Sequence, residues 1–142
     1  MGKRMILIGD CNDEDAGALS AVAQELGLKP VRARRTAEVL ALHRAGVDLA
    51  IVDIKSDSMA PEELWAELGK TNGPAVIVCS AEGSRDEVLN AMRMGCTDWI
   101  DKPLDNDNIK ACINRVMLRM GLKVEEEDGV VPKGSRGLVK EI

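Results

Sequence analysis

Residues 49–53 read LAIVD, an apolar run that ends in Asp53. A continuous apolar run of this length is typical of a strand that is buried on both faces, as in a parallel sheet. Further runs end in a polar group in the same way at residues 5–10 (MILIGD), 75–80 (AVIVCS) and 98–102 (DWIDK). The carboxyl ends of parallel strands share one edge of the sheet, so we expect these end groups to meet in one crevice. The groups are Asp10, Asp53, Ser80 and Lys102.

The segments between these runs carry apolar residues at helical spacing. This spacing predicts helices over 13–26, from Thr36 as the cap to near Gly46, over 61–68, over 84–94 and over 109–120, with Met120 on the apolar face of the last. Residues 31–34 alternate between apolar and charged, which indicates a half-exposed strand at an edge of the sheet. Strands that alternate with helices predict an α/β fold with a five-stranded, doubly wound parallel sheet.

Length and composition set limits on the class of protein. The chain has 142 residues, which fits one domain, and no apolar run approaches the roughly 20 residues of a membrane helix. Its start is too short in apolar residues for a secretory signal, so we expect a cytoplasmic protein without membrane contact. The net charge of -5 argues against direct nucleic-acid binding, and we interpret Arg32, Arg34 and Arg35 as a solvated edge.

The cysteines and the end of the chain carry less information. Cys11, Cys79, Cys96 and Cys112 lie within or beside apolar segments without C-x-x-C spacing, which indicates reduced thiols that pack as small hydrophobes. Helical periodicity ends near Gly121. We therefore predict one domain over 1–121 and a flexible tail or the start of a linker over 122–142, where acidic residues, glycine and proline dominate.

Several features taken in order resemble the receiver domain of bacterial two-component response regulators. They are the strand into Asp10, the strand into Asp53 followed by Met59 and Glu63-Leu64, Ser80-Ala81, the aromatic Trp99, and Lys102-Pro103. The resemblance covers about residues 3–120 and implies a flavodoxin-like (βα)5 fold with strand order 2-1-3-4-5. It implies a signalling domain rather than an enzyme.

The resemblance also implies a role for each residue of the crevice. Asp53 would accept a phosphoryl group from a histidine kinase or a phosphotransfer protein. Asp10, Asp53 and the backbone carbonyl of Lys55 would hold Mg²⁺, while Ser80 and Lys102 would bind the phosphoryl oxygens. Ser80 and Trp99 would switch the face formed by the fourth helix, fifth strand and fifth helix. That face would then bind an output domain or protein, or a second copy of the chain.

Some positions depart from the receiver pattern. Receivers usually carry a second acid where this chain has Cys11, and sulfur is a poor ligand for Mg²⁺, so we predict weakened Mg²⁺ binding. Asn12, Asp13 or Glu14 could reach the metal, but Asp13 and Glu14 equally suit the acidic first turn of a helix. Lys55 and Glu82 occupy the positions that tune loss of the phosphoryl group in the family. As opposite charges, they could bridge over the crevice and limit water.

Two other functions remain as alternatives. One is a pseudo-receiver, a protein-binding module that keeps the fold and signals without phosphorylation. The other is a flavin- or nucleotide-binding enzyme of similar winding, which needs a phosphate-binding loop after the first strand. The chain carries Asp10, Asp13, Glu14 and Asp15 there, and these acids would repel phosphate without a metal. The sequence does not identify the kinase, the regulated process or the oligomeric state.

Overall fold

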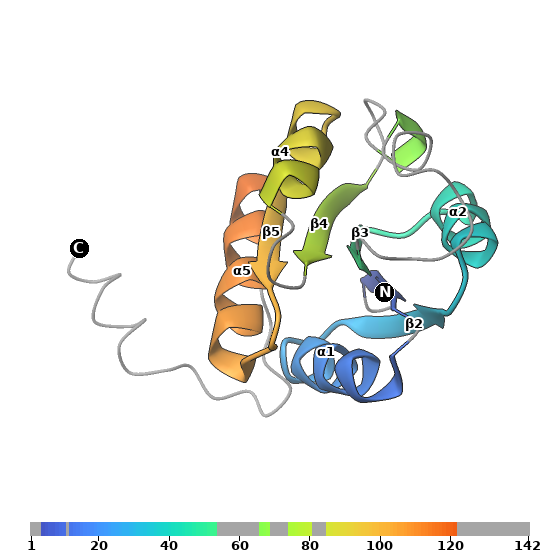
Figure 1. Ribbon diagram of the computed structural model, residues 1–142. Coiled ribbons are helices and arrows are strands. Elements are labelled where there is room, and N and C mark those ends of the chain that lie inside the picture. Colours follow the sequence, from blue (N-terminus) through green and yellow to red (C-terminus); the bar gives the residue numbers. More distant parts are fainter. Residues whose placement is uncertain (1–3, 11, 54–65, 69–73, 81–84, 122–142) are drawn as a thin grey trace.

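The computed structural model describes residues 4–10, 12–53, 66–68, 74–80 and 85–121 (Figure 1). The predictions for Cys11, Lys55 and Glu82 lie outside these residues, as does the tail over 122–142. Most of the helix predicted over 61–68 also lies outside them. Residues 66–68 are helical, and Leu68 is buried.

The described residues form a five-stranded parallel sheet in the order β2-β1-β3-β4-β5. Its strands are β1 (Met5–Gly9), β2 (Lys29–Ala33), β3 (Leu49–Asp53), β4 (Ala75–Ser80) and β5 (Asp98–Asp101). The predicted strand order is confirmed, and the half-exposed strand β2 lies at one edge. The register pairs Asp53 with Cys79 and Ser80 with Asp101, so the ends of β3, β4 and β5 lie level with one another.

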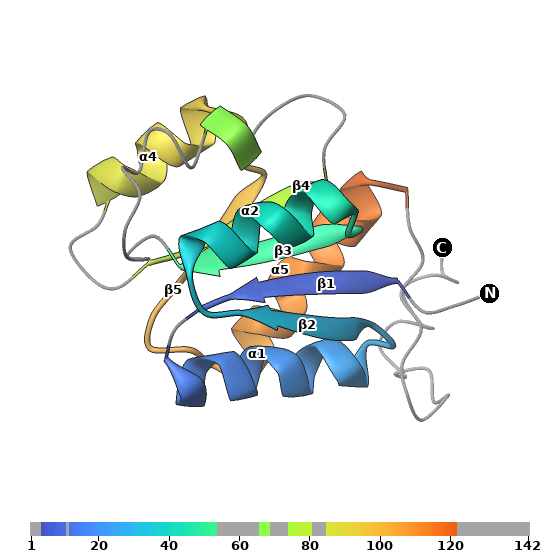
Figure 2. The ribbon, with the colours of Figure 1, turned by 90° about the vertical axis from the view of Figure 1, so that its right-hand side faces the viewer.

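Helices cover both faces of the sheet (Figure 2). They are α1 (Asp13–Glu25), α2 (Thr36–Ala45), α4 (Arg85–Arg93) and α5 (Asn106–Arg119). Helices α1 and α5 pack on one face, whereas α2 and α4 lie on the other. This doubly wound arrangement brings the start of α1 close to the carboxyl end of β1, where the crevice was predicted.

The core has two layers, one on each face of the sheet. Both layers are largely aliphatic, because the chain has no Phe or Tyr. Alternate residues of β1 serve the two layers: Ile6 and Ile8 pack with α1 and α5, and Leu7 packs with α2 and α4. Gly9 lets α2 approach β1 closely, since a Cβ at this position would lie 2.9 Å from Cγ2 of Val39. The last residue of β1 is therefore in direct contact with the helix above it.

The helix boundaries correct two details of the prediction. Thr36 is the first residue of α2 rather than its cap; the carboxylate of Glu38 instead accepts hydrogen bonds from the backbone N–H groups of Arg34 and Arg35. Met120 is partly exposed because α5 ends at Arg119 and the chain leaves the core there. Gly46 and Gly95 follow α2 and α4 with φ of 106° and 110°, a conformation that favours glycine.

The described cysteines agree with the prediction of reduced thiols that pack as small hydrophobes. Cys79, Cys96 and Cys112 are free and buried, and burial raises the pKa of Cys96 and of Cys112 to about 12. These thiols are therefore protonated at neutral pH and pack as hydrophobic groups. Within the described part of the chain, no helix is long and apolar enough to cross a membrane.

Candidate functional site

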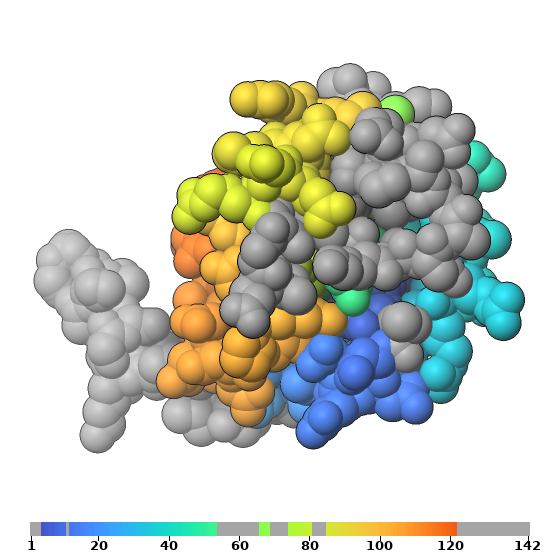
Figure 3. Space-filling model, viewed as in Figure 1, coloured from blue at the N-terminus to red at the C-terminus, as the bar shows by residue number. Residues whose placement is uncertain are grey.

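The predicted end groups meet at the carboxyl edge of the sheet. Asp10 directly follows β1, Asp53 and Ser80 end β3 and β4, and Lys102 directly follows β5. Figure 3 views this edge, where the blue atoms at the start of α1 lie against the orange atoms of the segment after β5. Residues that are far apart in the sequence are therefore neighbours at one edge.

Lys102 is the centre of the site, and its ammonium contacts carboxylates from separate elements. Its Nζ lies 3.0 Å from Oδ2 of Asp10, 3.1 Å from Oδ2 of Asp53 and 2.8 Å from Oδ2 of Asp15. A lysine ammonium has three hydrogens to donate, so three carboxylates satisfy it completely. We call Lys102, Asp10, Asp15 and Asp53 the lysine cluster.

The electrostatics of the lysine cluster favour a charged lysine and leave an excess of negative charge. Burial disfavours the ammonium, but hydrogen bonds from it to Asp15, Asp10 and Asp53 outweigh burial and raise the pKa of Lys102 above its usual range. The side chain of Lys102 is only 15% exposed, so solvent screens these pairs weakly. Three carboxylates around one ammonium leave a formal charge of −2.

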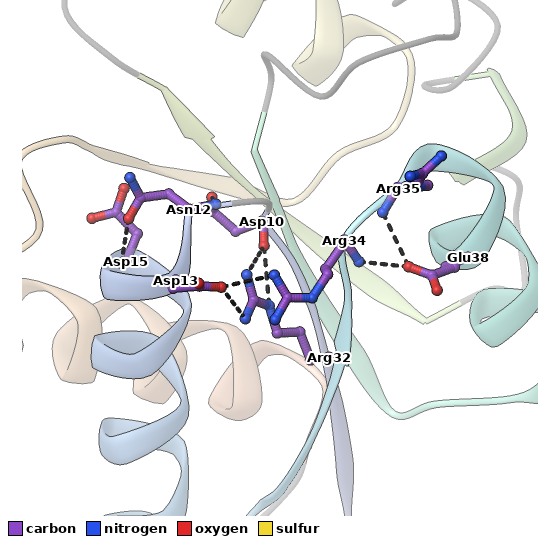
Figure 4. A network of polar contacts seen from close by, with 8 residues as sticks. All are labelled: Asp10, Asn12, Asp13, Asp15, Arg32, Arg34, Arg35 and Glu38. Carbon is purple, nitrogen blue, oxygen red and sulfur yellow. Dashed lines mark hydrogen bonds and ion pairs between the residues drawn. The ribbon is translucent and has the colours of Figure 1, made fainter.

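Both the carboxylate and the backbone carbonyl of Asp10 accept hydrogen bonds that hold the residue in place (Figure 4). Its Oδ1 accepts a hydrogen bond from the backbone N–H of Asn12 at 2.9 Å. Its backbone carbonyl accepts hydrogen bonds from Nε and Nη2 of Arg32, at 3.2 and 2.9 Å. The remaining carboxylate oxygen faces Lys102, so the backbone and an arginine from β2 together position this buried acid.

Among the basic residues predicted as a solvated edge, Arg34 and Arg35 are exposed, and Arg32 and Arg34 also form ion pairs. Nη1 of Arg32 and Nη1 of Arg34 each lie 2.8 Å from Oδ1 of Asp13 (Figure 4). Hydrogen bonds from these two guanidinium groups, and their charges, lower the pKa of Asp13 below 3.8. We call Arg32, Arg34 and Asp13 the arginine cluster. Asp13 therefore lies in the first turn of α1 and forms an ion pair with Arg32 of β2.

Ser80 reaches the carboxyl edge but contacts a different acid. It is buried, and its hydroxyl donates to Oδ1 of Asp101 at 3.4 Å, across the β4–β5 register pair. The backbone carbonyl of Ser80 accepts from the N–H of Lys102 at 2.7 Å. The serine is therefore joined directly to the segment that carries the lysine.

Trp99 lies on β5, the edge strand beside α4 and α5, and is 44% exposed. Burial alternates along β5, so Trp99 and Asp101 share the face of the strand opposite Asp98 and Ile100. On that other face, Asp98 accepts from Nε of Arg115 at 3.2 Å, which joins β5 to α5. The exposed indole therefore lies on the same face as the acid that holds Ser80.

Sequence reasoning missed Asp15 and Asp101 as parts of this site. The sequence places Asp15 only among the acids that follow the first strand, and the orientation of α1 shows that it faces Lys102. Its distance of three residues from the Asn12 cap was the available signal, because the third helical residue points back toward the helix start. For Asp101 the available signal was its position two residues after Trp99, because residues two apart in a strand point to the same face.

The donor chemistry of the lysine cluster fits a hard divalent cation. Carboxylate oxygens are the ligands that Mg²⁺ prefers, and the formal charge of −2 matches its charge. Within the described residues, no trio of His, Cys, Asp or Glu side chains is already arranged around a metal position. A cation would therefore have to share Asp10 and Asp53 with the ammonium of Lys102.

The fold and the site define a class of protein: an open α/β domain with carboxylates grouped around a lysine at the carboxyl edge of its sheet. The sequence model of the response regulator receiver domain matches residues 6–114. The chain belongs to this family of signalling domains.

Individual relatives agree with this family. The chain is 35% identical over 107 residues to the transcriptional regulatory protein GlrR of Escherichia coli, a match to 72% of this chain and 24% of that protein. It is 29% identical over 127 residues to a putative NtrX-like response regulator of Rickettsia bellii, a match to 87% of this chain and 27% of that protein. The chain thus spans about a quarter of these curated relatives.

Solved structures show the same fold. A response regulator receiver domain from Clostridium thermocellum superposes with a TM-score of 0.75 at 22% identity, and the match covers 83% of this chain and 97% of that one. NtrX from Brucella abortus gives a TM-score of 0.75 at 21% identity over 84% of this chain and 28% of that one. The strand order of the chain is therefore that of receiver domains.

Proposed function

We propose that this receiver accepts a phosphoryl group on Asp53 from a histidine kinase or a phosphotransfer protein. The observation that carries the proposal is the lysine cluster: the Lys102 ammonium lies within 3.1 Å of Asp53 and 3.0 Å of Asp10. Phosphoryl transfer depends mainly on alignment and on neutralising negative charge; Lys102 supplies positive charge beside Asp53, and Asp10 holds the ammonium there. The protein, and with it the transfer step, would belong to the cytoplasm.

In the proposed reaction, a carboxylate oxygen of Asp53 attacks phosphorus and forms an O–P bond. The N–P bond of the phosphohistidine breaks, and its electron pair returns to the imidazole nitrogen. Lys102 binds an oxygen of the transferred group, and Asp10 keeps the ammonium close to Asp53. Asp10, Asp53 and the backbone carbonyl of Lys55 would hold Mg²⁺, which supplies positive charge to the phosphoryl oxygens when it is bound.

The signal would leave the site through Ser80. Its hydroxyl is bound to Asp101 at a long distance, 3.4 Å, so a phosphoryl oxygen on Asp53 is a stronger acceptor for it. Release of Asp101 would change the face of β5 that also carries the exposed Trp99. We propose that α4, β5 and α5 form the output surface, for an output domain, a protein partner or a second copy of the chain.

The remaining parts of the proposal concern residues outside the described ranges. Lys55 and Glu82 would tune loss of the phosphoryl group by bridging over Asp53, and Cys11 would weaken Mg²⁺ binding. Residues 1–121 would form the receiver, and 122–142 would lead toward an output region. The GlrR relative is named a transcriptional regulatory protein and is about four times as long as its matched part, which supports an output region in a protein of this kind.

Mass spectrometry after treatment with acetyl phosphate and Mg²⁺ tests the phosphoacceptor. We expect one added phosphoryl group in the wild type and in Asp13→Asn, whose carboxylate lies in the arginine cluster. We expect none in Asp53→Asn, which removes the nucleophile and keeps the side-chain shape. An unmodified wild type, or equal modification of Asp53→Asn, would refute the proposal.

A phosphorylation-independent pseudo-receiver is the second candidate. One observation favours it: Lys102 already occupies the centre of the carboxylates, and the described residues contain no preformed metal trio. A Mg²⁺ titration of tryptophan fluorescence in a Trp65→Phe variant, which leaves Trp99 as the single indole, separates the two candidates. A saturable change supports the phosphoacceptor, whereas no change with Mg²⁺ and none with acetyl phosphate supports the pseudo-receiver.

A further inference from the structure

Asp15 makes the shortest contact of the lysine cluster. Its Oδ2 lies 2.8 Å from Nζ of Lys102, compared with 3.0 Å for Asp10 and 3.1 Å for Asp53. The backbone of Asp15 is also fixed, because its N–H donates to Oδ1 of the cap residue Asn12 at 2.9 Å. The first turn of α1 therefore presents this carboxylate to the lysine from a rigid position.

The other acids of the same turn behave differently. Asp13 is 75% exposed and pairs with arginines, and Glu14 is exposed. The side chain of Asp15 is 27% exposed and turns toward the sheet edge. General attraction of acids to the start of a helix explains all three residues equally. It does not explain why Asp15 alone of these three contacts Lys102 in the described structure.

The number of donors on the ammonium gives this contact a consequence. Lys102 has three hydrogens, and three carboxylates use them. Phosphorylation turns the Asp53 carboxylate into an acyl phosphate, so one phosphoryl oxygen takes over the hydrogen that Asp53 accepts, and a second phosphoryl contact must replace Asp10 or Asp15. Asp10 is almost fully buried and held by Arg32 and Asn12, so Asp15, the more exposed of these two, is the acceptor that can be exchanged.

We propose that Asp15 is a positioning residue that holds the Lys102 ammonium in the resting site and competes for it with a phosphoryl group on Asp53. The holding part concerns the protein without phosphate, and the competing part rests on the function proposed above. Asp15 thus sets how readily the lysine leaves its resting partners. Its role acts through Lys102, without contact between Asp15 and Asp53 being required.

Amine labelling of Lys102 as a function of pH tests the holding part directly. Acetic anhydride reacts with the neutral amine only, and mass spectrometry of the peptide that contains Lys102 gives the labelling rate. Asp15→Asn keeps the shape and solvent access but removes the charge. Asp15→Asn removes the shortest of the three carboxylate contacts that hold the side chain of Lys102, so we expect faster labelling than in the wild type at the same pH.

Variants at neighbouring positions separate this role from a general charge effect. Glu14→Gln removes one charge from the same turn of α1 and should leave the labelling profile unchanged. Asp15→Glu restores a carboxylate and should return most of the protection. Equal profiles for wild type and Asp15→Asn, an equal shift in Glu14→Gln, or a Glu variant as reactive as the Asn variant would each overturn the proposal.

Acetyl phosphate and Mg²⁺ then test the competing part. In the wild type, we expect phosphorylation of Asp53 to change the labelling rate of Lys102. In Asp15→Asn we expect a smaller change in this rate, because the Asp15 carboxylate that competes with the phosphoryl group is already absent. Equal changes in both proteins would overturn competition. A wild type that is not phosphorylated refutes the function proposed above, whereas the labelling result without phosphate still decides the holding role.

Discussion

Two clusters of opposite composition begin at the same turn of α1. In the arginine cluster, one carboxylate, Asp13, is shared by two guanidinium groups. In the lysine cluster, one ammonium is shared by three carboxylates, including Asp15 two residues further on. The first cluster has a formal excess of positive charge and is largely exposed, and the second has an excess of negative charge and is mostly buried at the carboxyl edge of the sheet.

The difference shows that burial, more than residue type, decides what an acid does at this turn. Water screens the pairs of the exposed Asp13, so they join β2 to α1 with little effect elsewhere. Lys102 and Asp10 have little contact with water, so an unbalanced charge there must be met by another ion. The lysine cluster is therefore the one suited to bind and release a charged group.

The largest expected effect comes from removing the lysine. Lys102→Met leaves three carboxylates without a cation, one of them almost fully buried. We expect a loss of about 3 kcal/mol in the free energy of unfolding, because an uncompensated buried charge is costly. Urea unfolding at low ionic strength measures it. Added Mg²⁺ should stabilise this variant more than the wild type, because the negative charge is larger.

Lys110→Met is the matched control for this loss. Lys110 forms an exposed pair with Glu25 at 3.4 Å, and such pairs contribute little to stability. If Lys110→Met lost as much stability as Lys102→Met, the contrast between buried and exposed clusters would be wrong.

A smaller effect is expected where the two clusters join. Arg32 belongs to the arginine cluster and also donates twice to the backbone carbonyl of Asp10. Arg32→Lys keeps the charge but loses the planar fork, so we expect a loss of about 1 kcal/mol. Arg34→Lys should have no measurable effect, because the guanidinium of Arg34 contacts the exposed Asp13 and the backbone N–H that Arg34 donates to Glu38 is kept. Equal losses in the two variants, measured by urea unfolding, would contradict this assignment.

The smallest effect concerns the pH dependence of the exposed cluster. Arginine contacts lower the pKa of Asp13 below 3.8, so its contribution to stability is present above pH 3.8. It is lost as the pH falls through the lowered pKa. The difference in melting temperature between wild type and Asp13→Asn should therefore be constant near neutrality and shrink in acid. It should also vanish near 1 M salt, where the screening length is about 3 Å. A difference that persists in salt would place Asp13 with the buried cluster.

Much of the fold follows from the sequence, because each of the apolar strands is followed by or ends in a polar residue. The runs into Asp10, Asp53, Ser80 and Lys102 gave the strands and their common edge, and the alternation in β2 gave its place at the end of the sheet. Local signals were weaker where a tertiary contact competes with them. Thr36 has a side chain that could cap a helix, yet it is Glu38, inside α2, that accepts hydrogen bonds from the backbone N–H groups of Arg34 and Arg35.

The site was harder to predict than the fold. The strand ends fixed which groups share the edge, but the rotation of α1 about its axis decides whether Asp13, Glu14 or Asp15 faces Lys102. That rotation follows from the packing of Ala16, Leu19 and Ala23 into the core, which no short motif encodes. The ion pairs of Arg32 and Arg34 could not be predicted for a similar reason, since their partner Asp13 lies on a different element.

Gly9 has a consequence for how this site can vary. An added methyl group there would press on the side chain of Val39 at 2.9 Å, one residue before the acid that faces Lys102. In a saturation mutagenesis library, position 9 should accept larger residues only together with a smaller residue at position 39. The two positions would then be inherited as a pair, and α2 would constrain the evolution of the crevice without touching any charged group in it.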